Sequence, residues 1–173
     1  MLKNSNTKFY FNCDCKHEFK SSLNNINQNK WCPYCKNKTE KIIFEKLITY
    51  YPNLIHQYKV EWCKNKTYLP FDFAIENKKI IIELDGRQHF EQVNNWRDPI
   101  EQQSIDKYKM NCAINNCFSI IRLLQEDVID STYDWFNELK YNIENIKSMQ
   151  IIFMCKNNEY TNFYNNKIKN NSI

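Results

Sequence analysis

The chain has 173 residues, of which 42% are hydrophobic and 15% aromatic, which suits one compact core plus a small module. Its formal net charge is +4, and no stretch approaches the roughly 20 consecutive apolar residues of a membrane-spanning helix. The first ten residues lack the apolar segment of a signal peptide, so we expect an intracellular protein with no membrane partner.

The positive charge is concentrated near the N-terminus. Residues 1–41 contain eight lysines and three acidic residues, a net charge of +5, so the rest of the chain is close to neutral. A small basic module beside a neutral body suits a polyanionic partner such as DNA. A solvated lysine surface is the alternative interpretation of the same charges.

The same basic segment carries two closely spaced cysteine pairs, Cys13-Asp-Cys15 and Cys32-Pro-Tyr-Cys35. Intracellular cysteines are kept reduced, and four thiolates form a ligand set that tetrahedral Zn²⁺ prefers. Residues 8–12 and 17–21 are predicted to form a hairpin around the first pair. We therefore predict a structural zinc site. The alternatives are disulfides, unligated core cysteines, or His17 as a substitute for one ligand of the first pair.

The central stretch is residues 79–90, where a run of isoleucines leads into Glu83-Leu-Asp85-Gly86. A β-branched run that ends at a glycine predicts a buried strand. Strand alternation places Glu83 and Asp85 on one face, and two adjacent carboxylates there favour a divalent cation. Gly86 is the only glycine of the chain, and we expect it to adopt positive φ or to allow close approach of a ligand. His89 follows within reach of this strand end.

The segments before the central strand predict a helix and two further strands. Residues 39–51 have helical periodicity and end at Pro52, and Glu40 lies in the first turn. Residues 55–63 and 68–76 predict strands that form a three-stranded meander with the central strand. Asp72 lies between two phenylalanines of the second strand, where a carboxylate is costly unless it is paired or bound to metal.

The segments after the central strand are predicted to be a polar loop over 91–99, a helix over 100–116 that carries Asp106, a strand over 117–124, a helix over 130–149 and a strand over 151–155. The order strand, helix, strand indicates a right-handed crossover to a parallel neighbour of the central strand. Residues 156–173 are rich in asparagine and predict a flexible tail.

These motifs resemble the restriction-endonuclease-like nucleases, in particular the very-short-patch-repair branch and its homing-endonuclease relatives with an E-D-x-H-D signature. The resemblance rests on Pro70-Phe-Asp-Phe-Ala74, Ile82-Glu-Leu-Asp-Gly-Arg-Gln-His-Phe90, Asp106-Lys-Tyr-Lys109 and Ser119-Ile-Ile-Arg-Leu-Leu124. The cysteine segment resembles the treble-clef zinc finger that precedes nuclease domains in phage and large DNA viruses. Together, the two resemblances imply an α/β fold: a restriction-endonuclease-like mixed sheet flanked by helices, preceded by a small treble-clef zinc finger. The implied domains are the zinc finger at 1–38, an endonuclease-like domain at 39–155 and a flexible tail at 156–173.

The resemblance also implies roles for individual residues. Asp72 would bind Mg²⁺, and Glu83 or Asp85 would supply the second metal carboxylate. His89 would orient or deprotonate water, Glu40 resembles the helical glutamate and Asp106 the late acidic member. The family's usual lysine is missing, because Asp85 stands in its place; Lys107 or Lys109 could supply its charge, or His89 its role. The expected DNA contacts are Arg87, Gln88, Trp96, Arg97 and Lys107.

The resulting hypothesis is a Mg²⁺-dependent DNA endonuclease whose zinc finger binds backbone phosphate through its lysines. One alternative is a non-catalytic zinc-finger nucleic-acid-binding protein on a nuclease fold. Another is an interaction protein whose finger binds a protein partner and whose carboxylates are structural.

Overall fold

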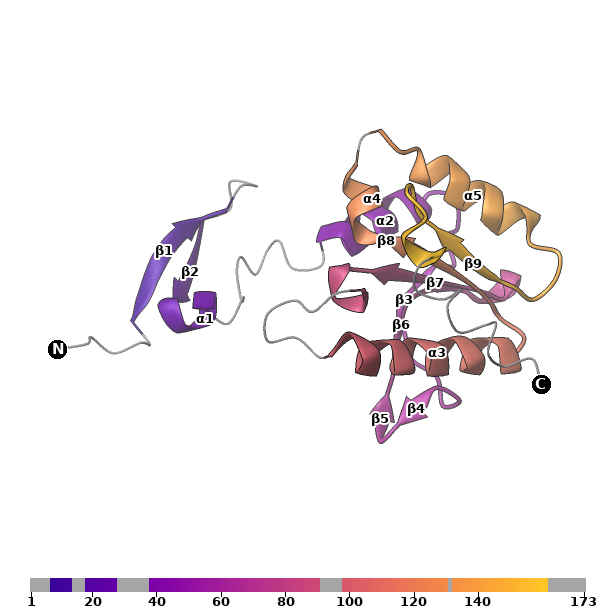
Figure 1. Cartoon of the computed structure of the whole chain (residues 1–173). Coiled ribbons are helices and arrows are strands. Elements are labelled where there is room, and N and C mark those ends of the chain that lie inside the picture. The colour runs from indigo at the N-terminus through magenta and orange to yellow at the C-terminus, as the bar shows by residue number, and fades with distance from the viewer. Residues whose placement is uncertain (1–6, 14–17, 28–37, 91–97, 131, 162–173) are drawn as a thin grey trace. The chain divides into compact units, whose positions relative to one another are not determined.

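The computed structural model describes residues 7–13, 18–27, 38–90, 98–130 and 132–161 (Figure 1). The chain divides into two compact units, Met1–Ile42 and Ile43–Ile173. None of the helices in these described ranges is both long and apolar enough to cross a membrane.

The N-terminal unit contains a β-hairpin. β1 (Lys8–Asn12) pairs antiparallel with β2 (Glu18–Ser22), and the short helix α1 (Leu23–Asn27) follows. The rings of Phe11 and Phe19 stack at 5.7 Å between centroids, and Cys13 is buried beside them. The predicted hairpin is thus confirmed. The zinc site stays a prediction, because Cys15, His17, Cys32 and Cys35 lie outside the described residues.

The second unit is built on a five-stranded mixed sheet in the order β3-β6-β7-β8-β9. The strands are β3 (Ile55–Tyr58), β6 (Phe71–Ile75), β7 (Ile80–Asp85), β8 (Ser119–Leu124) and β9 (Ile151–Met154). β3, β6 and β7 form the predicted antiparallel meander, whereas β8 runs parallel to β7 and β9 parallel to β8. The predicted crossover to a parallel neighbour of the central strand is therefore confirmed, and its right hand stays a prediction.

Helices cover both faces of this sheet. α3 (Pro99–Asn115) lies on one side, and α4 (Gln125–Ile129), α5 (Trp135–Asn145) and the second half of α2 (Lys38–Leu47) lie on the other (Figure 1). α3 begins where Asp98 caps it: the Ile100 N–H donates to its Oδ1 at 2.7 Å, and Pro99 occupies the first turn. Because both faces are covered, β8 is buried along its whole length.

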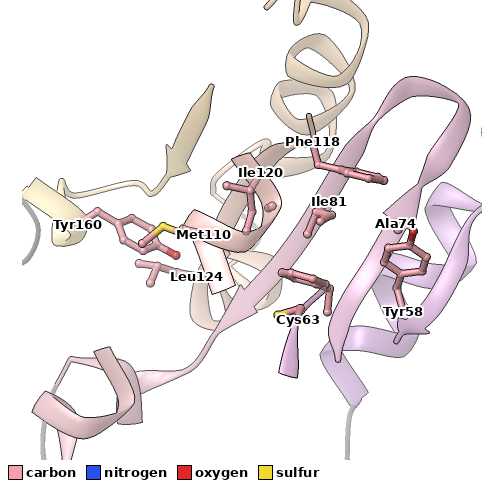
Figure 2. Packing of buried hydrophobic residues seen from close by; sticks show 11 residues of the cluster. Tyr58, Cys63, Ala74, Ile81, Met110, Phe118, Ile120, Leu124 and Tyr160 are labelled. Atoms are coloured by element: carbon pink, nitrogen blue, oxygen red, sulfur yellow. The ribbon is translucent and has the colours of Figure 1, made fainter. Parts of the chain in front are cut away.

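The core under α3 joins the central strands to that helix. Ile81 of β7 and Ile120 of β8 are completely buried and belong to one cluster with Met110 of α3 and with Phe118 (Figure 2). Burial of aliphatic side chains of this size contributes roughly 1.5–3 kcal/mol each. This packing fixes α3 over the sheet and determines which of its side chains can reach the strands.

Several predicted boundaries are wrong. The strand predicted over 55–63 ends at Tyr58, and the two-residue strands β4 (Lys64–Asn65) and β5 (Thr67–Tyr68) form a separate short hairpin after the predicted range. β6 begins only after Pro70, which has no N–H to donate to a strand ladder. The helix predicted over 130–149 is shorter, α5 (Trp135–Asn145), and Asp134 caps it by accepting from the Asn137 N–H at 3.4 Å; α4 precedes the predicted range.

Gly86 does not adopt positive φ. Its φ is −86° and its ψ 173°, which is extended backbone, so that part of the prediction is wrong. The left-handed residue of this region is Lys79, at φ 55°, which closes the 3-10 turn η1 (Glu76–Lys78) between β6 and β7. Gly86 is buried between β7 and the 3-10 turn η2 (Arg87–His89), which is consistent with a need for close packing there.

Candidate active site

Carboxylates from two neighbouring strands gather on the sheet face that α3 covers. The register pairs Phe73 with Ile82, which places Asp72 of β6 opposite Glu83 of β7. The backbone N–H of Leu84 donates to Oδ2 of Asp72 at 2.8 Å. Asp85 lies two residues farther along β7, on the same face as Glu83. The strand pairing therefore brings the predicted acidic residues of this region together.

Lys109 of α3 neutralises Glu83. Its Nζ lies 2.7 Å from Oε1 and 2.9 Å from Oε2 of Glu83, and it donates to the Pro70 carbonyl at 2.9 Å. Burial raises the pKa of Glu83, and the charge of Lys109 opposes that rise. Burial alone would lower the pKa of Lys109, but the charges of Glu83 and Asp72 raise it. The lysine ammonium is therefore held against Glu83, and the charge of Asp72 also acts on it.

Arg122 of β8 holds Asp85 in the same way. Its Nε donates to Oδ2 of Asp85 at 2.8 Å and its Nη2 donates to Oδ1, so the contact is bidentate. The Tyr160 hydroxyl adds a second donor to Oδ2 at 2.8 Å. Asp85 is 1% exposed and Arg122 is completely buried. Both oxygens of Asp85 are thus engaged by donors from this chain.

His89 pairs with Asp106. Its Nδ1 lies 2.7 Å from Oδ2 of Asp106 and 3.4 Å from Oδ1 of Asp85. Asp106 Oδ1 is 3.3 Å from Arg122 Nη2 and accepts from Gln102 Nε2 at 3.2 Å. Burial alone lowers the pKa of His89, but the Asp106 hydrogen bond and both aspartate charges raise it above 6.5. Burial alone would raise the pKa of Asp106, yet His89 and Arg122 lower it below 3.8.

Two groups of ligand atoms could hold a metal ion. One atom each from Asp85, His89 and Asp106 lie within 4.8 Å of one another. However, the Arg122 guanidinium already bridges the two aspartates, and a dication placed beside it would be repelled. Asp72 and Glu83 supply oxygen ligands next to the more flexible lysine side chain, so this pair is the better fit for Mg²⁺.

The remaining predicted site residues do not all fall into this cluster. Arg87 is exposed on η2 and forms an ion pair with Glu126 of α4. Lys107 is half-buried on α3. Glu40 lies in the first turn of α2, as predicted, but it belongs to the N-terminal unit. Its role in the site stays a prediction. Nothing is described of the Gln88 side chain, and Trp96 and Arg97 lie outside the described residues.

Sequence reasoning gave no role to Arg122 or Tyr160. A signal for Arg122 exists, because an arginine within the apolar run Ser119–Leu124 must meet a carboxylate when both sheet faces are covered. Tyr160 has no comparable signal, since it comes from a polar segment that was expected to be loose. Lys109 was considered only as one possible replacement for a missing lysine.

Comparisons of the chain with protein-family models, with curated proteins and with solved structures found no match.

Proposed function

We propose that the protein is a Mg²⁺-dependent DNA endonuclease. The observation that carries this proposal is the pairing of Asp72 with Glu83 across two antiparallel strands, with Lys109 held against Glu83 at 2.7 Å. Two carboxylates and a lysine at one strand end are the groups that metal-assisted phosphodiester hydrolysis uses. Lys109 supplies, from a helix, the positive charge that the resemblance to restriction-endonuclease-like nucleases requires.

The fold is compatible with this proposal. A three-stranded antiparallel meander followed by a helical crossover to a parallel strand is the arrangement expected of a restriction-endonuclease-like core. We therefore assign the second unit to that fold as part of the proposal, with the N-terminal unit as its treble-clef finger.

The metal would be held by Asp72 and Glu83, with Asp85 as an orienting group. When bound, it would supply a Lewis acid that activates water and neutralises charge on the phosphate. Release of Glu83 from Lys109 would leave the ammonium free to contact a phosphate oxygen. Arg122 and Tyr160 keep Asp85 engaged, so this carboxylate is better suited to orient its neighbours than to bind the ion.

His89 is the proposed proton-transfer group. A neutral ring that donates Nδ1–H to Asp106 leaves Nε2 as its basic nitrogen, able to accept a proton from water. Asp106 fixes this tautomer and the ring orientation, and Arg122 in turn holds Asp106.

The N-terminal unit is proposed to bind Zn²⁺ through Cys13, Cys15, Cys32 and Cys35 and to contact DNA. On the outer face of its hairpin, Lys20 Nζ lies 5.2 Å from the ring centroid of the exposed Tyr10. Lysines here would bind backbone phosphate in a salt-sensitive manner. Reduced thiolate ligands and a DNA substrate together suit an intracellular protein.

One specific observation favours the second candidate, a non-catalytic DNA-binding protein on the same fold. Glu83 and Asp85 already have cationic partners within the chain, which could make their role structural. Zinc-loaded protein incubated with supercoiled plasmid, in Mg²⁺ or Mn²⁺ and in chelator, separates the candidates. Metal-dependent nicking supports the nuclease. A salt-sensitive gel shift without nicking supports the binding protein. If the protein neither nicks the plasmid nor shifts it in a gel, both candidate functions are contradicted.

A further inference from the structure

The segment after β9 returns to the candidate active site. Residues 156–161, here called the C-terminal strap, are fixed at their start on α4 and the turn behind it. The Lys156 N–H donates to Oδ2 of Asp127 at 2.9 Å, and Lys156 Nζ lies 2.7 Å from Oδ2 of Asp130. From there the strap reaches the carboxyl end of β7, where the Tyr160 hydroxyl donates to Asp85.

The strap ends in a buried tyrosine. Tyr160 is 3% exposed, and its ring centroid lies 5.3 Å from that of Phe90 and 4.9 Å from that of Phe153. It belongs to the cluster that also contains Met110 and Leu124 (Figure 2). The hydroxyl of a tyrosine in such apolar surroundings needs a hydrogen-bond partner, and here that partner is Asp85.

The Tyr160 hydroxyl binds a carboxylate that two other side chains of the site also contact. It shares Oδ2 of Asp85 with Arg122 Nε, each at 2.8 Å. The other oxygen of Asp85 is contacted by Arg122 Nη2 and lies 3.4 Å from His89 Nδ1. Arg122 extends the network to Asp106, the partner of His89. The orientation of Asp85 is therefore coupled to the orientation of the histidine by two routes.

The tyrosine ring contacts the residue that follows the same histidine. Phe90, which the ring contacts edge to face, directly follows His89, and its backbone N–H closes η2 on the Arg87 carbonyl at 2.9 Å. A phenylalanine at position 160 would keep this ring contact and lose only the hydrogen bond to Asp85. The two functions of the side chain can thus be separated experimentally.

We infer that Tyr160 is a positioning residue of the proposed nuclease: its hydroxyl fixes Asp85, and through Asp85 and Arg122 it holds the His89–Asp106 pair in a reactive geometry. The C-terminal strap is thus part of the active site. This inference rests on the proposed endonuclease function, and the experiment below separates the two.

The test compares Tyr160→Phe with Tyr58→Phe in zinc-loaded full-length protein. Tyr58 is a matched control, because it is also buried and its hydroxyl donates to a carboxylate, Glu76 Oε1, at 2.6 Å, away from the site. Loss of an outer hydrogen bond to an active-site group costs roughly 10–100-fold in activity. We expect Tyr160→Phe to lower the kcat of Mg²⁺-dependent plasmid cleavage by about tenfold or more. KM for DNA should stay unchanged, and Tyr58→Phe should behave as wild type.

Cleavage by Tyr160→Phe at the wild-type kcat, or an equal loss in Tyr58→Phe, would overturn the inference. If the wild type cleaves nothing, the proposed function fails and the inference is decided by ¹⁵N spectra of the imidazoles, with His89→Gln to assign the signal. At a pH high enough to deprotonate the ring, the wild type should then give one His89 tautomer with the proton on Nδ1, and Tyr160→Phe a mixture of both. A single unchanged tautomer in the variant would overturn it.

Discussion

Lys109 of α3 and Glu83 of β7, which are 26 residues apart in the chain, form a buried ion pair with Nζ 2.7 Å from Oε1. The pair joins α3 to the centre of the sheet at the point where the carboxylates gather. Burial of either charge alone would cost a large desolvation free energy, and the attraction between the two charges offsets part of that cost.

Replacement of Lys109 by methionine should therefore destabilise the protein by about 3 kcal/mol, because Glu83 is left buried without its cation. The double variant Glu83→Gln/Lys109→Met should recover most of that loss, since no uncompensated charge remains. Urea unfolding of the single and double variants measures the coupling. Simple addition of the two single effects would contradict a direct interaction.

The His89–Asp106 pair predicts a stability that depends on pH. The pKa of His89 is raised above 6.5, so its contribution is present below that pH and is lost as the pH rises through the folded value. The pKa of Asp106 is lowered below 3.8, so its contribution is present above that pH and is lost on acidification. The His89–Asp106 pair thus contributes most to the stability of the folded protein between about pH 4 and pH 6.5.

We expect the difference in unfolding midpoint between wild type and His89→Gln, measured without Mg²⁺, to be largest near pH 5–6 and to shrink above about pH 7. Thermal unfolding across this range provides the measurement. A difference that is independent of pH, or that grows in alkaline buffer, would show that His89 is not paired as described.

Mg²⁺ should stabilise the protein through Asp72 and Glu83. An ion that binds only the folded state contributes about 2.7 kcal/mol at a concentration 100 times its Kd. Thermal unfolding should therefore shift upward with added Mg²⁺, and Asp72→Asn should remove the shift. Asp134→Asn, which makes the same change at the exposed start of α5, is the control that should retain it. An equal shift in both variants would place the ion elsewhere.

The finger should contribute phosphate contacts. Lys20 is exposed on β2, and replacement by glutamine should lower the slope of log affinity against log salt by about 1 in DNA-binding titrations. Glu18→Gln on the same strand removes a negative charge from the face and should not lower that slope. An unchanged slope in Lys20→Gln would exclude this lysine from the DNA contact.

Local patterns were sufficient to predict the centre of the fold. The isoleucine run of β7 and the alternation of Glu83 and Asp85 depend only on neighbours in the chain, and the meander and crossover follow from simple connection rules. The same is true of the hairpin β1–β2 and of the position of Glu40 in the first turn of α2.

Contacts between residues far apart in the chain could not be predicted from local sequence patterns. The Tyr160 hydroxyl meets Asp85 across 75 residues, and only tertiary packing brings the C-terminal strap there. Arg122 is an exception, because a charged side chain within a buried strand needs an oppositely charged partner, and the sequence alone is enough to predict this. Its position opposite Glu83 in the parallel register could have placed it in the site. Short elements such as α4 and the β4–β5 hairpin have too few residues for periodicity to identify them.

Asp72 is proposed to be essential to a metal-dependent cut in DNA. The most direct measurement is single-turnover cleavage of supercoiled plasmid in Mg²⁺ by the wild type, Asp72→Asn and the control Asp134→Asn. We expect the wild type and Asp134→Asn to cleave at similar rates. Asp72→Asn should lose about 100-fold or more, because removal of a group that stabilises transition-state charge costs roughly that factor. Cleavage by Asp72→Asn at the wild-type rate would show that Asp72 does not hold the metal ion that cleavage needs.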